Sequence, residues 1–254
     1  MNHRLTIIIA TFNSENTLEK SLESVSNLEY DLWECLIVDG GSSDNTIEIV
    51  ESFCEKDNRF RCISEPDKGI YDAFNKGWRN AKGEWIYYLG SDDWMDPNGM
   101  SMMMKVAETT DAAIVSGGVI VHHEGGGSNY WNGADGKPHW GGHQGMITRK
   151  SVIEKMGGFN LKFKIMGDKD LNVRILSAGY NVEVVNDITV AHFSRTGSSA
   201  SFKGQLLKCR ENYWIAKKGK TVRFPRIYAL YLLYIGVRSS IYQKLKKTFK
   251  SRLL

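Results

Sequence analysis

The fold of this chain is constrained most by short apolar runs that alternate with segments of helical periodicity. Residues 5–10, 35–38 and 84–89 are largely apolar, and residues 61–64 form a shorter candidate strand. Continuous apolar runs of this length are typical of parallel strands that are covered on both faces. Between the runs, apolar residues recur every three or four positions, as in residues 18–28. The alternation predicts a doubly wound α/β sheet built from right-handed βαβ units.

The second half of the chain is less regular. Residues 112–121 are expected to form a strand. Residues 122–145 are rich in Gly, His and Trp and have no periodicity, and they are long enough to be a functional loop. One more helix is expected over residues 171–178, followed by strands near residues 182–185 and 188–193.

Composition narrows the class of protein. The chain has 254 residues, of which 42% are hydrophobic and 24% are charged, and this excludes a disordered or collagen-like chain. Its four cysteines form no CxxC pair, so a zinc ribbon or a disulfide scaffold is not expected and a reducing compartment is favoured. No stretch of about 18 apolar residues is present, so we expect no membrane-spanning helix.

Charge divides the chain into two parts. Residues 203–254 hold 14 Lys or Arg and one acid, Glu211, whereas residues 1–202 are acidic overall. We therefore expect a main domain over residues 1–202 and a basic, aromatic helical extension over residues 203–254. An apolar, Tyr-containing run in the extension fits a helix lying in a membrane interface. A helix packed on the body or on a partner subunit is the alternative.

Polar residues gather where three of the predicted strands end. These clusters are residues 11–13, 39–41 and 91–93. Open α/β sheets bind ligands outside the carboxyl ends of their strands, where the strand order reverses. Helix capping explains many of these residues singly. The adjacent acids Asp92 and Asp93 are harder to explain in that way, because neighbouring carboxylates at a buried strand end repel each other unless a cation is present. Mg²⁺ or Mn²⁺ held together with substrate phosphates removes that cost.

Five segments, in this order, carry a family resemblance. They are residues 5–25 (LTIIIATFNSENTLEKSLESV), 34–46 (ECLIVDGGSSDNT), 65–94 (EPDKGIYDAFNKGWRNAKGEWIYYLGSDDW), 143–160 (HQGMITRKSVIEKMGGFN) and 166–176 (MGDKDLNVRIL). Together they resemble the inverting family 2 glycosyltransferases of the GT-A fold, and the last two resemble the colanic-acid-like subgroup that builds bacterial surface polysaccharides. The resemblance implies a mostly parallel, doubly wound sheet with a Rossmann-like nucleotide-binding half (residues 1–100) and an acceptor half (residues 101–202).

The resemblance also implies which residues bind the nucleotide. Phe12 would offer its ring to uracil, Asp39 would accept a hydrogen bond from the uracil N3–H, and Asp92 would contact the ribose. The full set implied is Thr11, Phe12, Asn13, Asp39, Lys68, Gly69, Asp72, Asn75, Ser91 and Asp92.

The metal and the catalytic base follow from the same resemblance. Asp93 would hold the metal that bridges the diphosphate, with Gly90 standing where relatives often carry another Asp, and His192 lies where some GT-A enzymes place a further ligand. Asp168 falls at the position of the base, which takes the proton of the acceptor hydroxyl, and Asp170 would be its structural neighbour. The alternative for both acids is a role at the start of a helix.

The sequence therefore predicts a metal-dependent, inverting glycosyltransferase. It would use Mn²⁺ or Mg²⁺ and move a sugar from a UDP-sugar to a hydroxyl of a bacterial, lipid-linked glycan. We expect a cytoplasmic protein, with the basic extension as a contact to the inner face of the plasma membrane. No nucleic-acid partner is expected, and a homo-oligomer is left open. The alternatives are an inactive nucleotide-sugar-binding subunit and a nucleotidyltransferase, although residues 11–17 lack the Gly-rich, basic phosphate loop that the latter needs.

Overall fold

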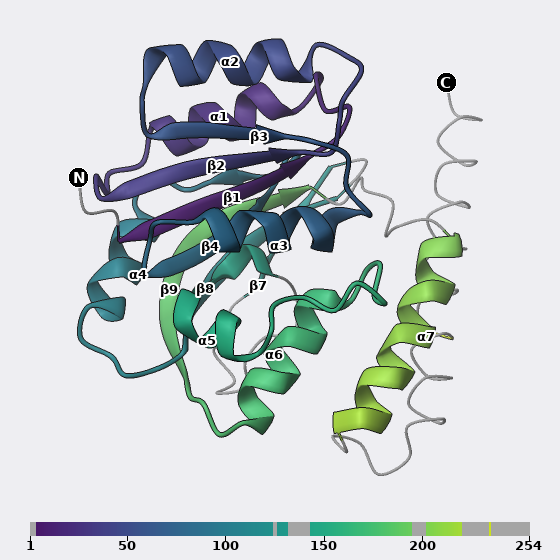
Figure 1. The fold of residues 1–254 in the computed structure, drawn as a ribbon. Helices are drawn as coiled ribbons and strands as arrows, with labels where there is room; N and C mark the ends of the chain where they lie inside the picture. Colours follow the sequence, from purple (N-terminus) through teal and green to yellow (C-terminus); the bar gives the residue numbers. More distant parts are fainter. Residues whose placement is uncertain (1–3, 124–125, 132–142, 195–201, 220–233, 235–254) are drawn as a thin grey trace.

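The computed structural model of the protein describes residues 4–123, 126–131, 143–194, 202–219 and 234. One mixed sheet is covered by helices on both faces (Figure 1). Its strands are β1 (Leu5–Thr11), β2 (Trp33–Asp39), β3 (Phe60–Ser64), β4 (Trp85–Gly90), β5 (Trp94–Met95), β6 (Ile114–His122), β7 (Ser128–Trp131), β8 (Met146–Arg149) and β9 (Val182–Ser194). The helices are α1 (Leu18–Ser26), α2 (Thr46–Lys56), α3 (Ile70–Asn80), α4 (Gly99–Ala107), α5 (Lys150–Lys155), α6 (Gly167–Ser177) and α7 (Phe202–Gly219), with a 3₁₀ turn, η1 (His143–Gly145).

The first half of the sheet is wholly parallel, with the order β3-β2-β1-β4. The order reverses at β1, because β2 lies on one side of it and β4 on the other. The register pairs Thr11 with Asp39 and Ala10 with Gly90. The polar clusters that follow these strands therefore meet at one edge of the sheet, where an α/β fold binds its ligand. The predicted α/β fold with a doubly wound, mostly parallel sheet is confirmed.

Two apolar clusters hold the helices on the sheet. Leu18 and Leu22 of α1, Val50 of α2 and Met100 of α4 pack on one face. On the other face, Phe74 of α3 packs with side chains from α5 and α6. Burial of both faces explains why the central strands are continuous apolar runs rather than alternating ones.

The second half of the sheet departs from the sequence prediction in two places. Residues 122–145 are not one loop, because β7 pairs with β6 and η1 closes the segment. The two strands expected over residues 182–193 form a single strand, β9. In β9 the pairing with β6 shifts register around Asp187, whose φ is +60°. The polar pair Asn186–Asp187 therefore marks a bulge within a strand, and not a break between two strands.

Helix α7 packs against the body of the protein beside α6 (Figure 1). Its Glu211 is buried, and the carboxylate accepts the backbone N–H groups of Lys164, Ile165 and Met166 at 2.7, 3.0 and 2.8 Å. Ile215 joins the apolar cluster beneath α6. Glu211 therefore fixes the segment that leads directly into α6.

Within the described part of the chain, no helix is long and apolar enough to cross a membrane. The apolar run expected at the membrane interface, residues 227–237, lies outside the described residues except for Tyr234, and so does the basic end of the chain. Their contact with a membrane stays a prediction.

Replacing Glu211 tests how strongly α7 is held. Glu211→Ala leaves three backbone N–H groups without their acceptor, so we expect the free energy of unfolding to fall by about 3 kcal/mol. The matched control is Glu55→Ala on α2, because Glu55 is exposed and a surface substitution changes stability little. Urea unfolding followed by circular dichroism measures both variants. Equal stability of the two variants would contradict the docking of α7 through Glu211.

Candidate active site at the carboxyl edge of the sheet

Asp39 organises the turn that follows β2. Its buried carboxylate accepts the backbone N–H groups of Gly41 and Ser42 and the hydroxyls of Ser42 and Ser64, at 2.5 to 3.0 Å. Burial alone would raise the pKa of Asp39, but these donors outweigh it and hold the pKa below its ordinary value. Three of the four bonds fall on Oδ2. Among the described residues, Oδ1 accepts one hydrogen bond, from the hydroxyl of Ser42. It can therefore accept another from a ligand.

The residues after β1 lie beside that turn. The Phe12 side chain is 61% exposed, and a methyl group on Gly40 would lie 3.4 Å from its ring. Asn13 has φ +49°. Its backbone N–H donates to Ser42 Oγ, and its side-chain Oδ1 accepts the backbone N–H of Ser43. The hydroxyl of Thr11 is buried and has no partner among the described residues. An exposed aromatic ring and an unpaired buried hydroxyl are the features of a surface that awaits a ligand.

The loop before α3 approaches the same place. A methyl group on Gly40 would lie 2.7 Å from Oδ2 of Asp67, and Oδ1 of Asp67 accepts the N–H of Gly69. Gly69 has φ +115°, a conformation that favours glycine. Asp72 accepts the N–H of Lys68. The structure thus brings Lys68, Gly69 and Asp72 to the edge that carries Phe12 and Asp39.

The acids after β4 complete this edge. Ser91 Oγ lies 3.1 Å from Ser14 Oγ, which ties the end of β4 to the segment after β1. Asp93 is 1% exposed, and its carboxylate accepts the N–H of Ser194 at 2.9 Å and the amide of Gln144 at 3.2 Å. Burial, reinforced by the charge of Asp92, raises the pKa of Asp93 to about 6.

The pair Asp92 and Asp93 fits a divalent cation. A methyl group on Gly90 would lie 2.6 Å from Oδ2 of Asp93 and 3.1 Å from Oδ1 of Asp92, so the two carboxylates converge above this glycine. Within the described residues, no three His, Cys, Asp or Glu side chains come together to hold a metal ion. One or two carboxylates with substrate phosphates are the usual Mg²⁺ site, so this pair meets the requirement when a diphosphate is bound.

Asp168 lies in the first turn of α6, opposite these acids. Its Oδ2 is 3.5 Å from Nδ1 of His143, its Oδ1 is 3.4 Å from the hydroxyl of Tyr71, and the side chain is 18% exposed. Burial would raise the pKa of Asp168, but the His143 ring, the N–H of Lys169 and Tyr71 hold it below its ordinary value. Asp168 is therefore an ionised, partly accessible carboxylate, as a proton acceptor must be.

The turn η1 joins the two acidic sites. Gln144 binds Asp93 through its side-chain amide, while the adjacent His143 faces Asp168 and also lowers the pKa of Asp93 through its charge. The carbonyl of Gln144 accepts the hydroxyl of Tyr87 from β4, which fixes the turn on the sheet. The sequence indicated that His143 and Gln144 could face an acceptor, but it did not indicate that Gln144 and Ser194 bind Asp93, because they lie 51 and 101 positions from it.

Two of the predicted residues have structural roles. The buried amide of Asn75 binds the backbone N–H and carbonyl of Phe159, both at 2.9 Å, and accepts the ring N–H of Trp78. These bonds tie α3 to the segment after α5, and the nucleotide-binding role expected for Asn75 stays a prediction. Asp170 is buried and paired with Arg174, in agreement with the structural role expected for it.

His192 lies on β9 between β5 and β6. Its Nδ1 lies 3.1 Å from Nε2 of His122, and its ring stacks on Trp94 with 5.1 Å between centroids. Burial and the charge of His122 lower the pKa of His192. These contacts pack the three strands together, and the metal-binding role expected for His192 stays a prediction.

Comparison with known proteins identifies the family. The model of "Glycosyl transferase family 2" matches residues 6–172, which include the strand ends, both acids of the pair and Asp168. The chain belongs to glycosyl transferase family 2. This confirms the family that the sequence predicts.

This family 2 protein aligns with a different fraction of each relative. It is 35% identical to the glycosyltransferase EpsH of Bacillus subtilis over 111 residues, which are 43% of this chain and 32% of that protein. It is 27% identical to the PGL/p-HBAD biosynthesis glycosyltransferase of Mycobacterium bovis over 206 residues, 75% of this chain and 77% of that protein. The chain therefore spans about a third of the first relative and three quarters of the second.

Solved structures share the fold. Staphylococcus aureus TarS 1–349 in complex with UDP-GlcNAc superimposes with a TM-score of 0.70 at 16% identity, over 92% of this chain and 71% of that one. The mannosyltransferase PcManGT of Pyrobaculum calidifontis, in complex with GDP-Man and Mn²⁺, gives a TM-score of 0.69 at 15% identity, over 99% of this chain and 80% of that one. At these identities the likeness establishes the fold of the family 2 chain.

The buried Asp93 gives stability a defined pH dependence. A carboxyl whose pKa is raised on folding stabilises the folded state below its unfolded pKa, and this contribution is lost as the pH rises through the folded pKa. With the pKa of Asp93 raised from 3.8 to about 6, the metal-free wild type should lose ~2 kcal/mol relative to Asp93→Asn between pH 4 and pH 6.5.

Urea unfolding in EDTA across this pH range measures the difference. Asp111→Asn, at an exposed position, is the matched control and should show no such trend relative to the wild type. A difference between wild type and Asp93→Asn that stays constant with pH would contradict a charge buried at Asp93.

Proposed function

We propose that this family 2 protein transfers a sugar from a UDP-sugar to a hydroxyl of a glycan acceptor, with inversion at the anomeric carbon and with Mn²⁺ or Mg²⁺. One observation carries the proposal: the turn η1 links a buried acid at the nucleotide edge, Asp93, to an ionised acid at the start of α6, Asp168. A metal-holding group and a proton acceptor on either side of one site are what a single displacement on a diphosphate-activated sugar requires.

The nucleotide would lie across the ends of β1, β2 and β4. Phe12 offers an exposed ring face for a base, and Oδ1 of Asp39 is an acceptor suited to the N3–H of uracil. Cytosine has no N–H at this position, so an ionised Asp39 favours uridine. Thr11, Asn13, Lys68, Gly69, Asp72, Ser91 and Asp92 border the same edge and are the proposed contacts to ribose and phosphates.

Asp92 and Asp93 would hold the metal. A divalent cation bound there supplies positive charge for the diphosphate of the donor and for the leaving UDP. Gln144 and Ser194 orient the Asp93 carboxylate by hydrogen bonds to each of its oxygens. These two bonds fix the orientation of the carboxylate, so its remaining lone pairs have a fixed direction. Carboxylates that bind metals are usually held by hydrogen bonds in this way.

Asp168 would act as the base. The acceptor hydroxyl attacks the anomeric carbon, the bond from that carbon to the UDP oxygen breaks, and Asp168 takes the proton. One displacement inverts the anomeric configuration. His143 and Tyr71 hold the carboxylate in position, and His143 is also a candidate to face the acceptor.

The named solved structures support a nucleotide-sugar donor, because TarS and PcManGT were solved with UDP-GlcNAc and with GDP-Man and Mn²⁺. The basic charge of residues 203–254 supports the further proposal of a lipid-linked glycan acceptor, a place at the inner face of the plasma membrane and contact with it through this extension.

The first test of this function is the link between metal and nucleotide. UDP should bind on the order of 10-fold more weakly in EDTA than in Mn²⁺, and Asp93→Ala should abolish this difference because it removes the metal-holding carboxylate. Calorimetric titrations of wild type, Asp93→Ala and the exposed control Asp111→Ala measure it. UDP affinity that is the same with and without Mn²⁺ in the wild type would rule out the metal site.

The second test separates chemistry from binding. Asp168→Asn keeps the size of the side chain but takes no proton, so the affinity for UDP should stay within about twofold while turnover of the UDP-sugar falls by about 10²–10⁴-fold. The matched control is Asp111→Asn, which should keep both. Full turnover by Asp168→Asn would show that the base lies elsewhere, and an inactive wild type that still binds UDP would favour a nucleotide-sugar-binding subunit.

A further inference from the structure

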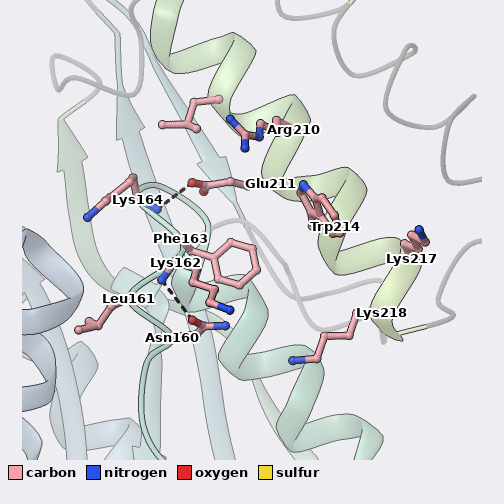
Figure 2. A pocket seen from close by; sticks show the side chains of 11 residues that line it. Asn160, Leu161, Lys162, Phe163, Lys164, Arg210, Glu211, Trp214, Lys217 and Lys218 are labelled. Carbon is pink, nitrogen blue, oxygen red and sulfur yellow. Dashed lines mark hydrogen bonds between the residues drawn. The ribbon is translucent and has the colours of Figure 1, made fainter.

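A second pocket lies between α7 and the segment that precedes α6. It has a volume of about 920 Å³, which is within the range of small-molecule sites. Figure 2 shows one wall formed by α7 and the facing wall by residues 160–164. The lining residues that the argument uses are Phe163, Lys164, Arg210, Trp214, Lys217 and Lys218.

The pocket is strongly cationic. Lys162, Lys164, Arg210, Lys217 and Lys218 line it, and none of them forms an ion pair with the acids that the structure describes. Its one acid, Glu211, is turned to the backbone N–H groups of residues 164–166 (Figure 2). The ammonium of Lys164 donates to the carbonyl of Lys68, so the positive charge left for a ligand is that of the other four cations. Clustered Lys and Arg select phosphate-type anions.

The pocket is also apolar. Trp214 is 52% exposed and Leu161 is 38% exposed, although both are large hydrophobic side chains. Phe163 lies between them, with its ring toward α7 (Figure 2). Exposed apolar side chains grouped in a concave surface mark a binding site. Cations together with apolar surface suit an amphiphilic anion, in which a charged head is joined to a hydrocarbon chain.

The pocket is directly connected to the proposed base. Glu211, on the floor of the pocket, accepts the backbone N–H groups of Ile165 and Met166, which lie three and two positions before Asp168. Lys169, next to Asp168, donates to Asn212 of α7. Lys164 reaches from the pocket to the carbonyl of Lys68 at the nucleotide edge. A molecule anchored in the pocket would thus extend toward the site where transfer takes place.

We propose that this pocket binds the phosphate or diphosphate and the first part of the hydrocarbon chain of a lipid-linked acceptor, so that the attached sugar reaches Asp168. This inference rests on the proposed function and assigns the acceptor end of the same site.

Isothermal titration of the full chain, with UDP and Mn²⁺ at saturation, tests the assignment. The probes are farnesyl diphosphate, inorganic diphosphate and farnesol. The saturating UDP keeps the probes from the nucleotide edge. Farnesyl diphosphate should bind at least about 10-fold more tightly than either of the others, because only it fills both the cationic and the apolar part.

Variants then locate the binding. Arg210→Gln with Lys218→Gln, and separately Trp214→Ala, should each weaken binding of farnesyl diphosphate by about 10-fold or more. All three side chains are exposed, so these changes leave the core intact. The matched control, Lys203→Gln, lies exposed on α7 outside the pocket and should bind as the wild type does.

Each contrary outcome would overturn a different part of the proposal. Inorganic diphosphate that binds as tightly as farnesyl diphosphate would make the pocket a free-phosphate site and refute the lipid assignment. Farnesyl diphosphate that fails to bind, or binds the variants and the wild type equally, overturns the pocket while the proposed function stands. Failure of UDP itself to bind in the presence of Mn²⁺ overturns both.

Discussion

The site depends on one buried carboxylate, that of Asp93, at the junction between the two halves of the sheet. Its side chain accepts hydrogen bonds from Ser194 at the end of β9 and from Gln144 of η1, and its backbone carbonyl accepts the hydroxyl of Ser21 in α1. Burying an ionised carboxylate is costly, and these donors offset the cost only in part, since the pKa of Asp93 remains raised to about 6. A cation at this position would remove the remainder. A metal ion bound at Asp93 would therefore remove a cost of burial that an exposed carboxylate does not have.

The same junction sets the distance between Asp93, at the carboxyl edge of the parallel strands, and Asp168, the proposed base. His143 and Gln144 are neighbours in a single 3₁₀ turn, yet one faces Asp168 and the other Asp93. The turn is held on β4 by Tyr87, and Asp168 is held from the other side by the α7 contacts of the segment before α6. Groups on rigid elements keep a catalytic geometry better than groups on loops. A change in η1 should therefore affect both acids together.

The sequence was informative where local pattern decides the structure. Strands β1, β2 and β4 are buried on both faces, so each reads as an apolar run, and the polar residues that end them stand out as the ligand edge. The second half lacked such signals. Strand β8 has four residues and β5 has two, too few for a period, and helices α4 and α5 were not predicted. The partners of Asn75 and His192 in the structure, Phe159 and His122, lie 84 and 70 positions away from them. No local pattern encodes a contact of that kind.

In the proposed enzyme the metal and the nucleotide meet at Asp93, on the carboxyl edge of β1, β2 and β4. Anomalous diffraction from crystals grown with UDP and Mn²⁺ is the decisive measurement. We expect one Mn²⁺ peak next to Asp93 and the diphosphate, with the uracil between Phe12 and Asp39. A Mn²⁺ peak at His122 and His192, or UDP bound in the α7 pocket with this edge empty, would contradict it.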